Sequence, residues 1–203
     1  MTMSTCKVLC VTNRRLVRGD FLTQIERIAA AGVTAILLRE KDLPPEEYVQ
    51  LAERAAEACA PYGVPLIPHT YTEAALRLGS RRIHLPGPVF FALTEAEQAR
   101  FETIGVSIHS VEEARAAASA GASYLTAGHV FATDCKRGLP PRGLPFLEEV
   151  CAAVDIPVYA IGGITPENAG ACLAAGAAGV CLMSSLMEAA EPEELLREFP
   201  GWK

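Results

Sequence analysis

Eight short apolar segments recur along the whole chain, and they constrain its fold more than any other feature. They begin at residues 7, 34, 64, 81, 103, 123, 156 and 179, so consecutive starts are 17 to 33 residues apart. Most of them are continuously apolar, as is typical of parallel strands buried on both faces. Because a strand, a helix and two loops need roughly 20–25 residues, most intervals leave room for one helix. We therefore expect an α/β fold, a single (β/α)8 TIM barrel over residues 1–203.

The intervals between these segments carry helix signals. Residues 45–59 begin with Pro and two Glu, which suit a helix N-terminus, and residues 110–120 begin with Ser110 as a cap. The interval after the third segment is short, so its helix at 72–78 should be short too. Ala-Gly pairs at 31–32, 120–121 and 175–176 precede later strands and fit the left-handed end of a helix. An open doubly wound sheet is the alternative, and the missing G-x-G-x-x-G motif weakens it.

Composition excludes several classes of protein. Half of the 203 residues are hydrophobic, so the chain can bury a substantial core, and the formal net charge of −6 argues against nucleic acid as a partner. The seven cysteines form no C-x-x-C pair and no zinc-ligand cluster, so we expect reduced thiols in a cytoplasmic protein. Neither a signal peptide nor a long apolar membrane span is evident, and we expect no membrane partner.

A phosphate site is the strongest chemical signal. Gly162 and Gly163 follow the seventh strand, and Ser184 and Ser185 follow the eighth, where a helix is expected to begin. Backbone N–H groups at such turns can surround a phosphate, and barrel enzymes often bind phosphate at this place. The alternative is that the glycine pair only makes a tight turn between strand and helix.

Cationic and imidazole side chains also gather at the expected strand ends. Arg39 closes the second strand, and Lys136 lies in a long loop at 128–143, so an anionic small molecule is expected, unless these cations only form a solvated rim. All four histidines lie at or just after strand ends, and His129, at the start of the long loop, is the best candidate for acid–base chemistry. Asp occurs only at four positions, none at the ends of the third or fourth strand, so we expect no metal site and no cofactor.

Several motifs resemble those of the thiamin phosphate synthase superfamily of small (β/α)8 barrels, over nearly the whole chain. They are Leu38-Arg39-Glu40-Lys41, Gly105-Val106-Ser107-Ile108-His109-Ser110, Thr133-Asp134-Cys135-Lys136 and Ala160-Ile161-Gly162-Gly163-Ile164. Within the superfamily, the run from Gly128 to Leu139 resembles a branch named for regulation of thiaminase expression, whose members are thiazole tautomerases.

Departures from the synthase pattern favour that branch. Where a synthase has Asn-Asp after the third strand, this chain has His69-Thr70; the acid after the fourth strand is missing, and Gly-Pro after the sixth strand is replaced by Gly128-His129. These departures imply that the ligands for Mg²⁺ and pyrophosphate are absent and that a proton-transfer group is present. We therefore expect a metal-independent isomerase, a thiazole tautomerase of thiamin biosynthesis that acts on a carboxythiazole phosphate.

The resemblance implies a role for each residue of the expected site. His129 would be the catalytic acid–base, and Arg39 or Lys41 would face the substrate carboxylate. The remaining expected substrate contacts are His69, Ser107, Thr133, Lys136, Gly162, Gly163, Met183, Ser184 and Ser185. Two alternatives stay open: a thiamin phosphate synthase joining a thiazole phosphate to a pyrimidine pyrophosphate, and a non-catalytic regulatory protein that binds thiazole phosphate. A homodimer also stays open.

Overall fold

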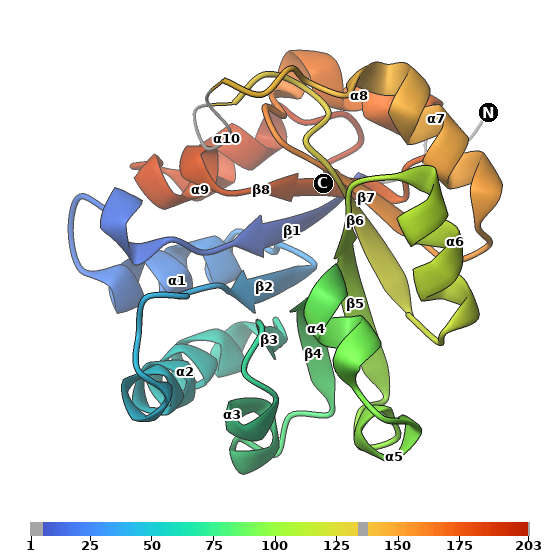
Figure 1. Cartoon of the computed structure of the whole chain (residues 1–203). Coiled ribbons are helices and arrows are strands. Elements are labelled where there is room, and N and C mark those ends of the chain that lie inside the picture. Colours follow the sequence, from blue (N-terminus) through green and yellow to red (C-terminus); the bar gives the residue numbers. More distant parts are fainter. Residues whose placement is uncertain (1–5, 134–137, 203) are drawn as a thin grey trace.

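Eight parallel strands form one sheet in the computed structural model, which describes residues 6–133 and 138–202. The sheet order is β3-β2-β1-β8-β7-β6-β5-β4. Figure 1 shows the strands as an inner ring with the helices outside it. The strands are β1 Lys7–Val11, β2 Ala35–Leu38, β3 Leu66–Pro68, β4 Arg82–Pro86, β5 Thr103–Ile108, β6 Tyr124–Gly128, β7 Val158–Ile161 and β8 Gly179–Leu182.

The ring is nearly closed between β3 and β4. These strands meet only through a parallel bridge of His69 with His84, where the N–H of Thr70 donates to the carbonyl oxygen of His84 at 2.9 Å. The other neighbours pair over three to five residues each. The expected (β/α)8 TIM-barrel fold is therefore confirmed, and the open doubly wound sheet is wrong.

Helices follow the strands as the spacing predicts. The short helix after the third strand is α3, Thr72–Arg77, and Ser110 caps α6, Val111–Ser119, by accepting from the N–H of Glu113 at 3.1 Å. The other helices of the described residues are η1 Arg14–Leu16, α1 Phe21–Ala30, α2 Pro45–Cys59, η2 Ala60–Tyr62, α4 Gly87–Ala92, α5 Glu95–Gln98, α7 Gly143–Ala153, α8 Pro166–Ala174, α9 Ser184–Glu188 and α10 Pro192–Arg197. None of them is both long and apolar enough to cross a membrane.

The core has two layers. A large apolar cluster fills the space between strands and helices, as expected when each strand is covered outside by a helix. A smaller cluster fills the inside of the ring, and its buried members are Leu9, Val11, Ala35, Leu37, Ile67, Tyr124, Tyr159 and Cys181. The buried polar residues include His84 and Thr126, so the interior is not wholly apolar.

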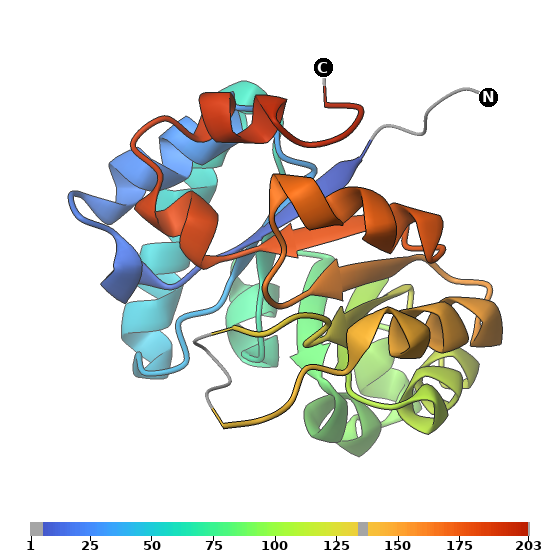
Figure 2. The same cartoon turned by 90° about the horizontal axis from the view of Figure 1, so that it is seen from above.

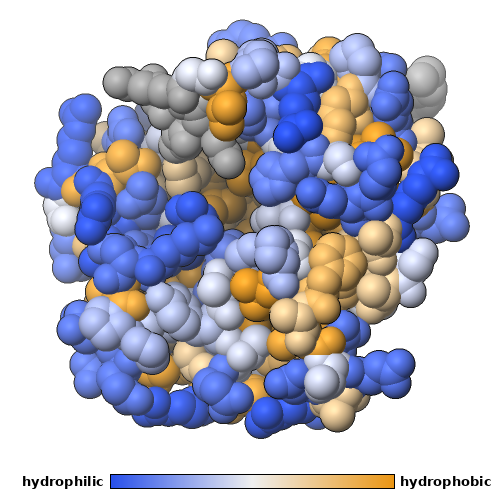
Figure 3. Space-filling view, viewed as in Figure 1, coloured by the Kyte–Doolittle hydropathy of each residue, from blue (hydrophilic) through white to orange (hydrophobic). Residues whose placement is uncertain are grey.

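The long connection after β6 is the main departure from a minimal repeat. In Figure 2 its described part after β6 extends away from that strand, and the described part from residue 138 on leads into α7. Seen from the side of Figure 1, the surface is mostly hydrophilic at its rim, while hydrophobic atoms gather toward the middle and one side (Figure 3). Leu139 in this connection is 59% exposed, the largest value among the large hydrophobic residues within 6–133 and 138–202.

Candidate functional site

The ends of β1 and β2 are joined by a buried carboxylate. Glu40 is 2% exposed, and it accepts a hydrogen bond from the Thr12 hydroxyl at 2.7 Å and from Arg14 Nη1 at 3.0 Å. The Thr12 hydroxyl in turn accepts from the backbone N–H of Arg39 at 2.9 Å. Glu40 is therefore turned toward β1, while its neighbours Arg39 and Lys41 are left on the other side of the chain.

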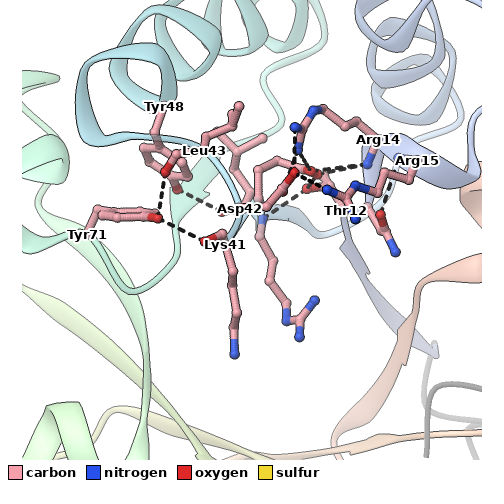
Figure 4. Close-up of polar contacts among 12 residues, drawn as sticks. Thr12, Arg14, Arg15, Lys41, Asp42, Leu43, Tyr48 and Tyr71 are labelled. Carbon is pink, nitrogen blue, oxygen red and sulfur yellow. Dashed lines mark hydrogen bonds and ion pairs between the residues drawn. The ribbon is translucent and has the colours of Figure 1, made fainter.

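The same network continues to the surface. Arg14 makes two hydrogen bonds to the carboxylate of Asp42, at 2.6 and 2.7 Å, and Arg15 adds a third at 2.8 Å (Figure 4). The Arg14 guanidinium holds the pKa of Asp42 well below its usual range. Glu40 and Asp42, which flank Lys41 in the sequence, are thus both paired with arginine.

Helix α2 fixes the ends of β2 and β3 through one tyrosine. The buried Tyr48 hydroxyl donates to the carbonyl oxygen of Leu38 at 2.7 Å and accepts from the backbone N–H of His69 at 2.9 Å. Tyr71 packs against Tyr48 with ring centroids 4.4 Å apart, and its hydroxyl contacts the carbonyl oxygen of Lys41 at 3.3 Å. The Lys41 side chain points away from both tyrosines (Figure 4).

His69 and His84 form a stacked pair of neutral rings where β3 meets β4. Their ring centroids are 5.2 Å apart, and the side chains are 5% and 1% exposed. Burial lowers the pKa of His69 to about 2, and the charges of His84, Lys41 and Arg39 act in the same direction. Burial and the charge of Lys41 lower the pKa of His84 to about 3. The two cations at the end of β2 therefore act on this pair, and both rings are uncharged at neutral pH.

His84 also belongs to a polar network inside the ring. Its Nδ1 lies 3.0 Å from the Tyr124 hydroxyl, and its Nε2 lies 2.9 Å from the Ser107 hydroxyl. The Thr126 hydroxyl lies 3.1 Å from that of Ser107. His84 is therefore a packed, hydrogen-bonded side chain, and Ser107 is half-buried near the end of β5.

The expected phosphate turn follows β7 and lies against the long connection. Gly162 and Gly163 have φ of +100° and +65°, which favour glycine. A Cβ on Gly162 would lie 2.4 Å from Cβ of His129, and one on Gly163 would lie 2.3 Å from the carbonyl oxygen of Ala132. The backbone N–H of Phe131 donates to the carbonyl oxygen of Gly162 at 3.0 Å. The structure thus brings the glycine turn and the start of the connection into direct contact.

The remaining predicted residues that the structure describes lie in the connection after β6 or follow β8. His129 is 7% exposed, and its Nε2 is 3.4 Å from the carbonyl oxygen of Leu139. Thr133 is half-buried in the connection; Met183 precedes α9, which begins at Ser184 and Ser185. Lys136 lies outside the described residues.

Sequence reasoning missed Thr12, Tyr48, Tyr124 and Thr126, and it did not assign a role to Glu40. Thr12 and Glu40 directly follow predicted strands, which was the available signal. Tyr48 comes from the first turn of α2, and nothing in its spacing marks it. Tyr124 and Thr126 alternate along β6, so a prediction that even-numbered residues of this strand face the inside of the ring would have found them.

The described residues do not fit a resident magnesium site. Within 6–133 and 138–202, no group of three or more His, Cys, Asp or Glu side chains could hold a metal ion. Magnesium binds through carboxylate oxygens together with substrate phosphates, whereas Glu40 and Asp42 are held by Arg14.

Comparison with known proteins identifies relatives along most of the chain. Residues 8–186 match the family model described as thiamine monophosphate synthase. The chain is 37% identical over 195 residues to a thiamine-phosphate synthase of Roseiflexus castenholzii, covering 94% of this chain and 85% of the relative. It is 40% identical over 168 residues to that of Moorella thermoacetica, covering 80% and 78%. A solved thiamine phosphate pyrophosphorylase from Pyrococcus furiosus superposes with a TM-score of 0.81 at 28% identity, covering 96% and 94%.

These relatives correct the expected activity. The prediction of a metal-independent thiazole tautomerase, an isomerase, is wrong, because the relatives at 37% and 40% identity are named as synthases. The prediction rested on departures at a few positions, such as Thr70 and His129. At this level of identity most positions differ between relatives, so a few departures carry less weight than similarity along the whole barrel.

Proposed function

This chain belongs to the thiamine monophosphate synthase family, and from this membership we propose that it is a thiamine-phosphate synthase. It would join a thiazole phosphate to a pyrimidine pyrophosphate and release pyrophosphate. The observation that carries the proposal is the 37% identity to a thiamine-phosphate synthase over 94% of this chain and 85% of the relative. The match to the family model, over residues 8–186, includes β2 to β8 and all of β1 except Lys7.

The cations at the end of β2 support this activity. Displacement of pyrophosphate leaves a strongly anionic product, and fixed positive groups aimed at developing charge stabilise such a transition state. Arg39 is half-buried, and its backbone N–H is held by Thr12. The carboxylate of Glu40, which follows Arg39 in the sequence, is bound by Arg14 and Thr12. We assign the side chains of Arg39 and Lys41 to the pyrophosphate group.

The glycine turn supports the phosphate of the second substrate. Gly162 and Gly163 carry no side chain that would cover their backbone, and the residues before and at the start of α9 follow the neighbouring strand. We assign the thiazole phosphate to the backbone of Gly162, Gly163, Met183 and Ser184, with Ser185 beside them. Sites of this kind after the last two strands are common in barrel enzymes.

A coupling assay tests the proposal. The purified protein is mixed with thiazole phosphate and pyrimidine pyrophosphate, with added Mg²⁺ in one arm and EDTA in the other. We expect thiamine phosphate and pyrophosphate to appear in equal amounts. Binding of thiazole phosphate without any coupled product in either arm would overturn the proposed function and favour a binding protein.

Paired arginine variants sharpen this assay. We expect Arg39→Ala to lower kcat/KM by about 100-fold, because it removes a charge that acts on the leaving group. Arg15→Ala is the matched control, since Arg15 is exposed and contacts Asp42 on the outer side of the network. Equal losses in both variants would contradict the assignment of Arg39 to pyrophosphate.

A further inference from the structure

The hydrogens of the network inside the ring can be assigned from its partners. The side chain of Tyr124 lies inside the ring and belongs to a residue that is 8% exposed, and among the described residues its hydroxyl contacts only Nδ1 of His84. A phenol can donate one hydrogen, and a buried donor without an acceptor is costly. Tyr124 therefore donates to Nδ1, and Nδ1 of His84 carries no hydrogen.

This assignment fixes the other side of the imidazole ring. A neutral His84 with an unprotonated Nδ1 carries its hydrogen on Nε2, which donates to the Ser107 hydroxyl at 2.9 Å. The Thr126 hydroxyl has two neighbours, Nε2 of His84 at 3.4 Å and Ser107 at 3.1 Å. Since Nε2 already holds a hydrogen, Thr126 also donates to Ser107. The Ser107 oxygen thus accepts two hydrogen bonds, and its own hydrogen is left for a group outside the network.

Gly105, which lies opposite His84 in the sheet, leaves the space that the contact between His84 and Tyr124 occupies. Gly105 pairs with both His84 and Tyr124 in the sheet. A Cβ on Gly105 would lie 2.1 Å from Cζ of Tyr124 and 2.5 Å from Nδ1 of His84. Its need for glycine is therefore steric, because a side chain there would displace the contact that orients the ring.

We propose that Tyr124 and His84 are positioning residues that hold the Ser107 hydroxyl as a hydrogen-bond donor toward an oxygen of a phosphorylated ligand at the strand ends. The relay runs from the interior of the ring outward, through Tyr124, His84 and Ser107. It carries no net charge, and its direction is set by the phenol, for which His84 is the one acceptor among the residues that the structure describes. A donor fixed in this way selects an acceptor oxygen and disfavours a ligand group that itself donates.

The nature of the ligand rests on the proposed function, but the relay itself does not. The charges of Lys41 and Arg39 act on the neighbouring His69, so an anionic acceptor would meet these cations and Ser107 at the same end of the ring. Inorganic phosphate, inorganic pyrophosphate and thiazole phosphate share this acceptor chemistry, and each serves as a separate probe.

Nitrogen NMR of the free protein tests the relay without any ligand. We expect His84 to show one tautomer, with hydrogen on Nε2. In Tyr124→Phe both tautomers should appear, because the group that selects between them is gone. Tyr159→Phe is the matched control, since Tyr159 is equally buried and packs on Tyr124 with centroids 5.7 Å apart. Hydrogen on Nδ1 in the unsubstituted protein would overturn the proposal, even if the variants fail to fold.

Titration with the three probes tests the donor. We expect Ser107→Ala to raise Kd by about tenfold for at least one probe, because it removes a hydrogen bond to a charged acceptor. Tyr124→Phe should raise Kd about twofold if half of the molecules then have the Ser107 hydroxyl donating to Nε2 of His84 and not to the ligand. In the Ser107→Ala background the Tyr124→Phe effect should vanish.

The possible failures are distinguishable. An unchanged Kd in Ser107→Ala for every probe that binds would overturn the donor role, and a persisting Tyr124→Phe effect in the Ser107→Ala background would show that Tyr124 acts on structure alone. If the probes bind as expected and no coupled product forms, the proposed function fails while the relay stands.

Discussion

Two polar networks hold buried side chains in place, and they differ in charge. The network after β1 and β2 is ionic: Glu40 and Asp42 share Arg14. The network of β4, β5 and β6 is neutral: Tyr124, His84 and Ser107 are joined only by uncharged hydrogen bonds. The ionic network reaches solvent at Arg15, whereas the neutral one faces the inside of the ring.

The difference separates two tasks. The ionic network ties the segments after β1 and β2 together and pairs Glu40 and Asp42 with Arg14. The neutral network avoids the cost of burying a charge, and it defines the direction of hydrogen bonds. A charge on His84 would be disfavoured by burial and repelled by Lys41, and both lower the pKa of this ring. Disturbing each network separately tests this distinction.

The largest effect on stability is expected from acidification, which favours protonation of the buried histidines His69 and His84. The pKa values of His69 and His84 are lowered on folding to about 2 and about 3, so the unfolded chain binds more protons below pH 6.5. Their contribution to stability is complete above pH 6.5 and is lost as the pH falls. For each of these two histidines, the free energy of unfolding should fall by about 1.4 kcal/mol with every pH unit below 6.5.

Urea unfolding at pH 7 and pH 5 measures this loss, which should reach about 4 kcal/mol for the pair. Most carboxylates remain ionised over this interval, so they contribute little. His69→Gln should reduce the pH dependence by about half. A free energy of unfolding that stays constant between pH 7 and pH 5 would contradict buried neutral histidines.

Removal of the buried carboxylate of Glu40 disrupts the ionic network. We expect Glu40→Ala to lower the free energy of unfolding by about 3 kcal/mol, because Thr12 and Arg14 lose their shared partner. Thermal unfolding measures the change. Asp42→Ala is the control for the exposed end of the same network: its effect should be much smaller and should shrink further in high salt. An equal loss in both variants would show that burial does not distinguish Glu40.

A smaller effect is expected from filling the space beside the relay. Gly105→Ala should lower the free energy of unfolding by about 2 kcal/mol, because the methyl group would overlap Tyr124 and His84. Gly170→Ala in α8 is the matched control, since nothing lies within 4 Å of the added methyl group and alanine favours a helix. Denaturant unfolding compares the two; similar stability in both variants would mean that the ring interior can yield around Gly105.

Much of the site's location was predictable from the sequence, because parallel strands place their C-terminal ends together. Arg39, His69, Ser107 and Gly163 were expected there, and the structure places them after or at the ends of β2, β3, β5 and β7. Their contacts were not predictable in the same way. Glu40 lies between two expected cations, and only the fold shows that it turns toward Thr12, 28 residues earlier in the chain.

The sequence by itself determined the barrel and its family, because apolar segments at regular spacing can be buried together in few ways and because the match extends over residues 8–186. Tertiary structure alone decided which polar atoms meet. Tyr124 reaches His84 across 40 residues, and the register of β4, β5 and β6 brings them together opposite Gly105. The reason is physical: the pattern of burial is a local property of the chain, whereas the direction of a hydrogen bond depends on what the neighbouring strands place beside it.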